Sequence, residues 1–204
     1  MNIDYDYLSD VKQAISAVSP EYYKWIDAVK HKRASVERVF CYEFYHQFRK
    51  IMEENNNAND RYNHLLFNAE IEKRGFDESQ KIYPDFVLHM GQNCFECQKF
   101  AIEVKTNARL EKNNFNKDIK KLFELISTDN ERKYEFGVFI CINKSSNNLI
   151  KFIKEKLSDD LLRKIKATDK LNKIFCISAI IKDENYYGSN GIDVKSLSLC
   201  DILK

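Results

Sequence analysis

The 204-residue sequence has little glycine and proline, with five and two residues respectively. These low counts exclude collagen-like and low-complexity chains, and 44% hydrophobic residues suffice for a buried core. The longest apolar runs, Phe136–Ile142 and Ile174–Ile181, have the length of strands and are too short for a membrane-spanning helix. The acidic start, MNIDYDYLSD, lacks the basic and then apolar order of a secretory signal. We therefore expect a cytoplasmic protein without membrane association.

The chain also lacks a large excess of either charge, because 33 Lys and Arg residues face 31 Asp and Glu residues. The formal net charge of +2 excludes a polycation that binds nucleic acid through its whole surface. Charge is nevertheless segregated along the chain. Residues Lys99–Lys121 include seven basic and three acidic residues, a local charge of +4, whereas Glu53–Asp85 includes four basic and eight acidic residues, a local charge of −4. Any basic surface must therefore be local.

The cysteines do not indicate a metal or redox site. Cys94 and Cys97 form a lone C-x-x-C motif, and no second Cys or His pair has a comparable spacing. Their segment resembles a hairpin turn, whereas a reactive thiol is favoured at a helix N-terminus. We expect reduced cysteines.

No linker rich in Pro, Gly or Ser divides the chain, so we expect a single domain over residues 1–204. Its expected parts are an N-terminal helical extension (1–34), a core (35–142) and a C-terminal helix-strand extension of the same domain (143–204). The tail from Lys182 has no clear assignment.

The spacing of apolar residues predicts a mixed α/β fold with a central sheet flanked by helices. Two helices are expected within 5–31, divided at Ser19-Pro20, and a longer helix from Ser35 to about Glu54, followed by a polar loop over ENNNAND. Short loops between the next three strands favour an antiparallel meander, after which a helix crosses over to a parallel strand. The expected elements are strands 64–72, 82–90 and 100–105, helix 115–126, strand 134–142, helices 148–157 and 160–167, and strand 174–181.

Two charged motifs lie on neighbouring predicted strands. Pro84-Asp85 is at the edge of one strand, and Glu103-Val104-Lys105 is within the next. Glu103 and Lys105 are two residues apart and therefore project from the same face. Pairing of the strands as a hairpin would bring Asp85 opposite them. Two carboxylates beside a lysine suit a hard divalent cation such as Mg²⁺, with the lysine orienting a water and offsetting phosphoryl charge.

These residues resemble the signature of the PD-(D/E)XK nuclease superfamily, and Pro84, Asp85, Glu103 and Lys105 fill its four positions. The expected element order over residues 35–142 is similar to the αβββαβ core of that restriction-endonuclease-like fold. The resemblance implies that Asp85 and Glu103 hold one or two Mg²⁺ ions, for which Mn²⁺ substitutes. An activated water then attacks the phosphorus in line, while Lys105 positions it or stabilises developing charge. The backbone carbonyl of Val104, between the two side-chain groups, is a further expected ligand.

The resemblance also implies an acidic residue on an upstream helix. Glu37 shares a stripe with the apolar side chains of the predicted helix, so we expect it to face the sheet and complete the metal site. Glu43, on the flank of that stripe, is the second choice. Glu70 is an additional candidate ligand, and Arg38 is a candidate anchor for a carboxylate or a phosphate.

Helix 115–126 contains the run Lys117-Asp-Ile-Lys-Lys-Leu, which is similar to the helix after E-x-K in small nucleases of this type. Lys117, Lys120 and Lys121 are expected to contact DNA, because a basic helix beside a carboxylate site suits a phosphodiester substrate. The expected activity is that of a Mg²⁺-dependent endonuclease acting on DNA. A small nuclease often needs a second copy to cut both strands, so a homodimer is considered, although no segment marks a dimer face.

Other interpretations remain open. In one interpretation, Glu103 and Lys105 form an exposed ion pair on an edge strand. Glu37 would then only interact favourably with the dipole of its helix. Lys117, Lys120 and Lys121 would form a solvent-exposed face of their helix. A catalytically inactive module on the same fold would bind DNA or a protein, fail to bind Mg²⁺ and tolerate Asp85→Asn. An assembly or toxin-neutralising protein would present Glu53–Asp85 to a basic partner.

Overall fold

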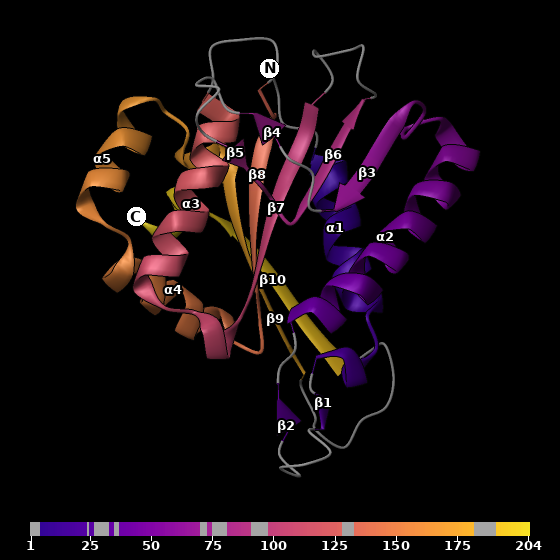
Figure 1. Cartoon of the computed structure of the whole chain (residues 1–204), viewed down its shortest axis with the longest axis horizontal. Coiled ribbons are helices and arrows are strands. Elements are labelled where there is room, and N and C mark those ends of the chain that lie inside the picture. The colour runs from indigo at the N-terminus through magenta and orange to yellow at the C-terminus, as the bar shows by residue number, and fades with distance from the viewer. Residues whose placement is uncertain are drawn as a thin grey trace.

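The computed structural model describes residues 5–23, 25–26, 33–34, 37–69, 73–74, 81–90, 98–127, 133–181 and 191–204. Its centre is a six-stranded mixed sheet with helices on both faces, as Figure 1 shows. The strands, in spatial order, are β10 (Ile192–Ser198), β9 (Ile174–Ile181), β8 (Phe136–Ile142), β7 (Gln98–Thr106), β6 (Phe86–Met90) and β3 (Leu65–Ala69).

The remaining elements surround this sheet. The helices are α1 (Tyr5–Ala17), α2 (Glu37–Asn59), α3 (Lys112–Ser127), α4 (Ser146–Lys156), α5 (Asp159–Ala167) and α6 (Leu199–Ile202), with single 3₁₀ turns at Pro20–Tyr22, Asn107–Arg109 and Leu171–Lys173. Two short ribbons pair β1 (Trp25–Ile26) with β2 (Arg33–Ala34), and β4 (Lys73–Arg74) with β5 (Lys81–Ile82). No helix among these ranges is long and apolar enough to cross a membrane.

The strand directions confirm the predicted α/β organisation. The first three strands, β3, β6 and β7, pair antiparallel as a meander. Helix α3 then crosses over to β8, which runs parallel to β7, and β9 runs parallel to β8. The C-terminal strand β10, which the sequence left unassigned, adds antiparallel to β9 at the edge.

Two apolar cores lie on opposite faces of the sheet. Ile102 and Val104 of β7 belong to the core beneath α1 and α2, whereas Ala101 belongs to the core shared by α3, α4, α5 and α6. Because β7 and β8 are covered on both faces, almost all of their described residues are buried, and β8 is apolar throughout. Odd-numbered positions of β7 face α3, and this places Glu103 and Lys105 on that side.

Helix α2 is aligned on the sheet by a stripe of phenylalanines. Phe40, Phe44 and Phe48 are fully buried, and Phe48 and Phe44 lie 4.4 and 6.1 Å, between ring centroids, from Phe67 on β3. Phe44 also contacts Phe86, the first residue of β6, at 5.3 Å. These contacts fix the start of α2 next to the β6–β7 hairpin.

The polar loop predicted over ENNNAND is wrong, because α2 continues to Asn59 and ends at Asp60, which has a positive φ of 55°. Tertiary contacts stabilise this weakly helical segment. The buried carboxylate of Asp10 on α1 accepts hydrogen bonds from Asn55, Arg61 and Tyr62, at 3.1, 3.0 and 2.6 Å. The end of α2 is therefore anchored to α1.

The second helix predicted within residues 5–31 is also wrong. Pro20 begins only one 3₁₀ turn, and β1 follows it. Tyr23 is fully buried, and its hydroxyl donates to the carbonyl of Ile15 at 2.9 Å. The Tyr23 ring also contacts Phe40 of α2, at 5.1 Å between ring centroids, so Tyr23 is packed against both α1 and α2.

Helix α3 packs closely on the sheet at Gly137 of β8. A Cβ atom at this position would lie 3.0 Å from the Cβ of Leu122, closer than ordinary packing allows. Leu122 follows Lys121 directly, so this approach sets how deeply the middle of α3 lies against β7 and β8.

Candidate functional site

The β6–β7 hairpin brings the two charged motifs together, as the sequence predicts. Asp85 directly precedes β6, and the pairing of Phe86 with Ile102 places it opposite Glu103. The backbone N–H of Val104 donates to Asp85 Oδ2 at 2.7 Å. The carboxylate of Asp85 is therefore fixed to the middle of the E-x-K segment.

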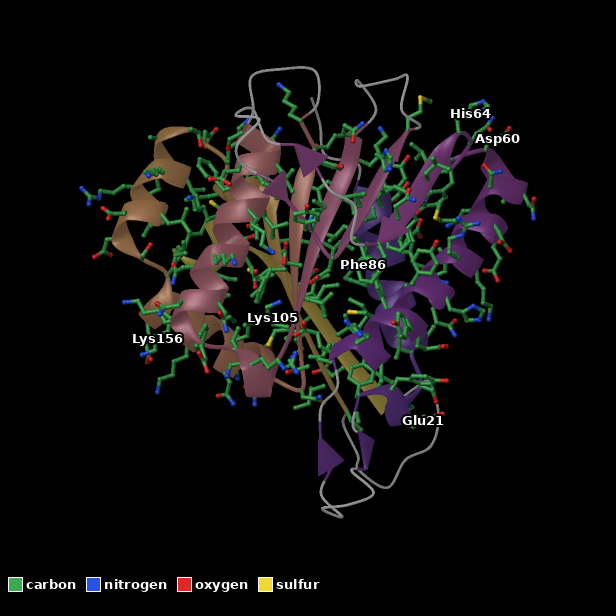
Figure 2. The ribbon with its side chains drawn as sticks, viewed as in Figure 1. Glu21, Asp60, His64, Phe86, Lys105 and Lys156 are labelled. Atoms are coloured by element: carbon green, nitrogen blue, oxygen red, sulfur yellow. The ribbon has the colours of Figure 1, made fainter. Side chains whose placement is uncertain are left out.

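Lys105 connects this hairpin to both flanking layers. Its ammonium group donates to the Val104 carbonyl at 2.9 Å and lies 3.4 Å from Asp118 Oδ2 on α3. It also lies 3.7 Å from Glu37 Oε1 at the start of α2. Figure 2 shows Lys105 between α2 and α3. The structure thus brings Glu37 into the same cluster as the E-x-K motif.

Glu103 is held by a second lysine. Its side chain is fully buried, and both carboxylate oxygens accept hydrogen bonds from Lys121 Nζ on α3, at 2.7 and 2.8 Å. Lys121 also lies 3.3 Å from Asp118 Oδ1. Since β7 is a central strand, the interpretation of Glu103 as part of an exposed ion pair on an edge strand is wrong.

The cluster shifts the pKa values of its own members. Burial, and then the neighbouring Asp85 and Asp118, raise the pKa of Glu103 to about 9. Burial also raises the pKa of Asp85. Burial acts to lower the pKa of Lys105 and of Lys121, but the surrounding carboxylates outweigh it and raise both values. Both lysines are therefore cationic at neutral pH.

In the sequence, Asp118 belongs to the run Lys117–Leu122 that resembles a nuclease helix, but it was not predicted to be a site residue. It is buried, three residues before Lys121 and on the same side of α3 as the apolar Phe115 and Leu122. Its position within the apolar stripe of the helix could have identified it, because a buried carboxylate seldom lacks a charged or hydrogen-bonding partner.

The chemistry of the cluster suits a hard cation. Asp85, Glu103, Glu37 and Asp118 supply carboxylate oxygens, and the Val104 carbonyl is among them, which is the ligand type that Mg²⁺ prefers. Glu37 Oε2 and Asp118 Oδ2 are buried without a hydrogen-bond partner. Four carboxylates against two ammonium groups also leave a formal charge of −2 when all are ionised.

The side chains are not arranged around a cation in the present conformation. Within the described ranges, no three His, Cys, Asp or Glu side chains are grouped closely enough to hold a metal ion. Lys121 instead occupies both oxygens of Glu103. A metal ion bound at Glu103 would have to displace Lys121, and the acidic side chains would have to move closer together around it.

The other predicted residues lie apart from this cluster or outside the described residues. Lys117 and Lys120 are exposed on α3, and Lys120 lies 3.4 Å from Glu124. Glu43 accepts a hydrogen bond from Gln47 at 2.6 Å and does not join the site. The predictions for Ser35, Glu70, Cys94 and Cys97 fall outside the described residues.

A cavity of about 620 Å³ opens beside the cluster. Asp85 and Glu37 of the cluster are among its lining residues. The rest of its wall comes from α2, from the end of β3 and from the 3₁₀ turn after β7, and includes Arg38, Tyr42 and Arg109. Asp85 and Glu37 thus border a space large enough for a small ligand.

No model of a known protein family matches the chain, and no curated protein matches it by sequence.

Proposed function

We propose that the protein is a Mg²⁺-dependent nuclease of the PD-(D/E)XK type that hydrolyses DNA phosphodiester bonds. One arrangement carries the proposal: Asp85 accepts the Val104 N–H, while Lys105 lies on the Val104 carbonyl and beside Glu37. Two strands and one helix thereby bring the expected acidic residues and the expected lysine to one point.

The order of the elements supports the same proposal. Helix α2 is followed by the meander β3, β6 and β7, by α3, and by the parallel strand β8. This is the αβββαβ order expected of a restriction-endonuclease-like core. On this interpretation α1, with the turn after it, and the segment from α4 to α6 are additions to that core.

Each residue of the cluster then has a distinct role. Asp85, Glu103 and the Val104 carbonyl are the proposed metal ligands, with Glu37 completing the set. When bound, Mg²⁺ supplies Lewis-acid activation of a water and neutralises phosphate charge. Lys105 contacts Val104 and Asp118. Its proposed role is to orient the attacking water and to stabilise the charge that develops on phosphoryl oxygens.

Asp118 is a positioning residue in this scheme. Its two oxygens lie 3.4 Å from Lys105 Nζ and 3.3 Å from Lys121 Nζ. It thereby sets the separation of the two ammonium groups. Neutralising Asp118 should misplace Lys105 and lower the rate constant for cleavage while leaving DNA affinity unchanged.

One observation favours a second function, that of a catalytically inactive module that binds DNA. Lys121 satisfies both oxygens of Glu103, so the buried carboxylate is neutralised without a metal ion. Such a module would retain DNA binding, fail to bind Mg²⁺ and tolerate Asp85→Asn.

Conversion of supercoiled plasmid separates the two functions. The purified protein is incubated with Mg²⁺, Mn²⁺ or EDTA, and the nuclease predicts nicked or linear DNA only with the metal ions. Lys105→Met should abolish the conversion. Lys151→Met, on α4 with a side chain 76% exposed, is the matched control and should cut like the wild type. Cleavage that persists in Lys105→Met, or no cleavage by protein that binds DNA, would refute the catalytic proposal.

A further inference from the structure

The cavity beside the acidic cluster is lined by basic and aromatic side chains that the proposed hydrolysis does not use. Its lining includes Glu37 and Asp85 of the cluster, and also the basic residues Arg38 and Arg109. Its volume of about 620 Å³ is within the range of roughly 300–1,000 Å³ typical of small-ligand sites. A ligand in this space would extend directly from the proposed metal site.

Two guanidinium groups at this cavity are free to bind an anion. Arg38 and Arg109 are exposed, and neither forms an ion pair with any residue that the structure describes. They flank a site whose own carboxylates repel a phosphate. Because a guanidinium binds phosphate through two parallel hydrogen bonds, the pair suits phosphates on either side of a reacting one.

The cavity wall also carries an exposed aromatic ring on a rigid support. Tyr42 of α2 is 68% exposed, the largest exposure among the described large apolar and aromatic side chains. One turn further along, Tyr45 packs against the rings of Phe67 and Phe86, and its hydroxyl donates to the Phe67 carbonyl at 3.2 Å. Tyr45 is thus part of the wall, whereas the ring of Tyr42 remains available for stacking.

We infer that the cavity receives one unpaired nucleotide of a DNA strand, with its base against Tyr42 and its phosphates at Arg38 and Arg109. Bases stack on aromatic side chains irrespective of sequence. A base inside a duplex cannot reach such a wall unless it leaves the stack, which costs free energy. The preferred substrate is therefore a single strand or a duplex with an unpaired end. This inference rests on DNA as the proposed substrate.

Binding without hydrolysis tests the inference. Fluorescence anisotropy in EDTA compares a labelled 12-nucleotide single strand with the blunt duplex of the same sequence. We expect the single strand to bind about tenfold more tightly. Tyr42→Ala should weaken single-strand binding about tenfold and leave duplex binding unchanged, while Tyr42→Phe, which keeps the ring, should stay within about twofold of the wild type.

The arginines are tested by the salt dependence of the same binding. Arg38→Gln and Arg109→Gln should each reduce the slope of log affinity against log salt by about 0.7, the value for one phosphate contact on a single strand. Arg163→Gln, on α5 with a side chain 77% exposed, is the matched control and should leave the slope unchanged. Slopes that fall equally in all three variants would contradict specific phosphate contacts at the cavity.

The outcomes also distinguish this inference from the proposed hydrolysis. If single-strand binding depends on Tyr42 but the protein does not cleave plasmid, the inferred nucleotide cavity is supported and the nuclease proposal is refuted. If the wild type cleaves DNA with metal ions but Tyr42→Ala binds the single strand like the wild type, the nuclease proposal is supported and the inferred nucleotide cavity is refuted. Blunt duplex bound as tightly as the single strand would also refute the cavity, and absence of binding to either DNA would overturn both proposals.

Discussion

The ammonium group of Lys121 donates to both carboxylate oxygens of the fully buried Glu103, at 2.7 and 2.8 Å. This ion pair joins α3 to β7, and it occupies the oxygens that a metal ion would need. Lys121 therefore determines how readily Glu103 becomes available to a cation.

Lys121→Met removes this charge and keeps the length of the side chain. The metal-free protein should lose unfolding free energy mainly above about pH 9, where Glu103 is ionised and left buried without a cation, and lose less at pH 7, where Glu103 is protonated. Mn²⁺ should stabilise the variant more than the wild type, since the ammonium group of Lys121 then no longer competes for Glu103. Urea unfolding with and without Mn²⁺ measures both effects. Lys120→Met, at a side chain 59% exposed on the same helix, should behave like the wild type, and equal stabilisation by Mn²⁺ in all three proteins would contradict competition.

The raised pKa of Glu103 makes the stability of the metal-free protein depend on pH. The folded protein binds a proton at Glu103 more tightly than the unfolded chain does, so this contribution is complete below the unfolded pKa of about 4.3 and is lost as the pH rises toward about 9. The unfolding free energy should fall by more than about 1 kcal/mol between about pH 5 and pH 9. Glu103→Gln should flatten the curve, and identical pH profiles for the two proteins would contradict the shift.

Metal binding should release protons. The proposed ligand Glu103 would bind a cation as a carboxylate, and burial raises its pKa to about 9, so a metal ion would displace its proton. The apparent affinity for Mg²⁺ should therefore rise with pH between about 6 and 8.5. Calorimetric titration in two buffers of different ionisation enthalpy gives the number of protons released. Glu103→Gln should release fewer protons, and a heat of binding that is the same in both buffers would exclude the effect.

Lys117 and Lys120 should contribute to DNA affinity through charge alone. Each lysine→Gln change should reduce the slope of log affinity against log salt by about one for duplex DNA. Lys121→Gln should change the slope less, because its ammonium group is held at Glu103. Anisotropy over a salt series measures the slopes, with Lys151→Gln on α4 as the control. If neither Lys117→Gln nor Lys120→Gln changes the slope, the DNA does not contact this part of α3.

The sequence was sufficient for the meander and for the meeting of Asp85 with the E-x-K segment. Both follow from local patterns: apolar runs of strand length, short loops, and side chains that alternate between faces. Strand 174–181 has the bounds that its apolar run predicts. Glu37 was also placed correctly near the site, since its stripe along α2 is a local property of the helix.

The parts that the sequence did not reveal depend on contacts between distant segments. The Asn-rich end of α2 is helical because Asn55 contacts Asp10, 45 residues earlier. Lys121 reads as one of several solvent-facing lysines, and only the packing of α3 on β7 shows that it meets Glu103. Asp118 was missed for the same reason, because its two lysine partners come from α3 itself and from β7.

The absence of a side chain at Gly137 affects the ion pairs between α3 and β7, although Gly137 itself carries no charge. A methyl group there would act as a wedge between β8 and Leu122, since its Cβ would lie only 3.0 Å from that side chain. Raising α3 by a few tenths of an ångström would stretch the links that Asp118 and Lys121 make to β7. An apolar substitution deep in the core is thus a way to tune the strength of a charged cluster while every ionisable residue stays in place.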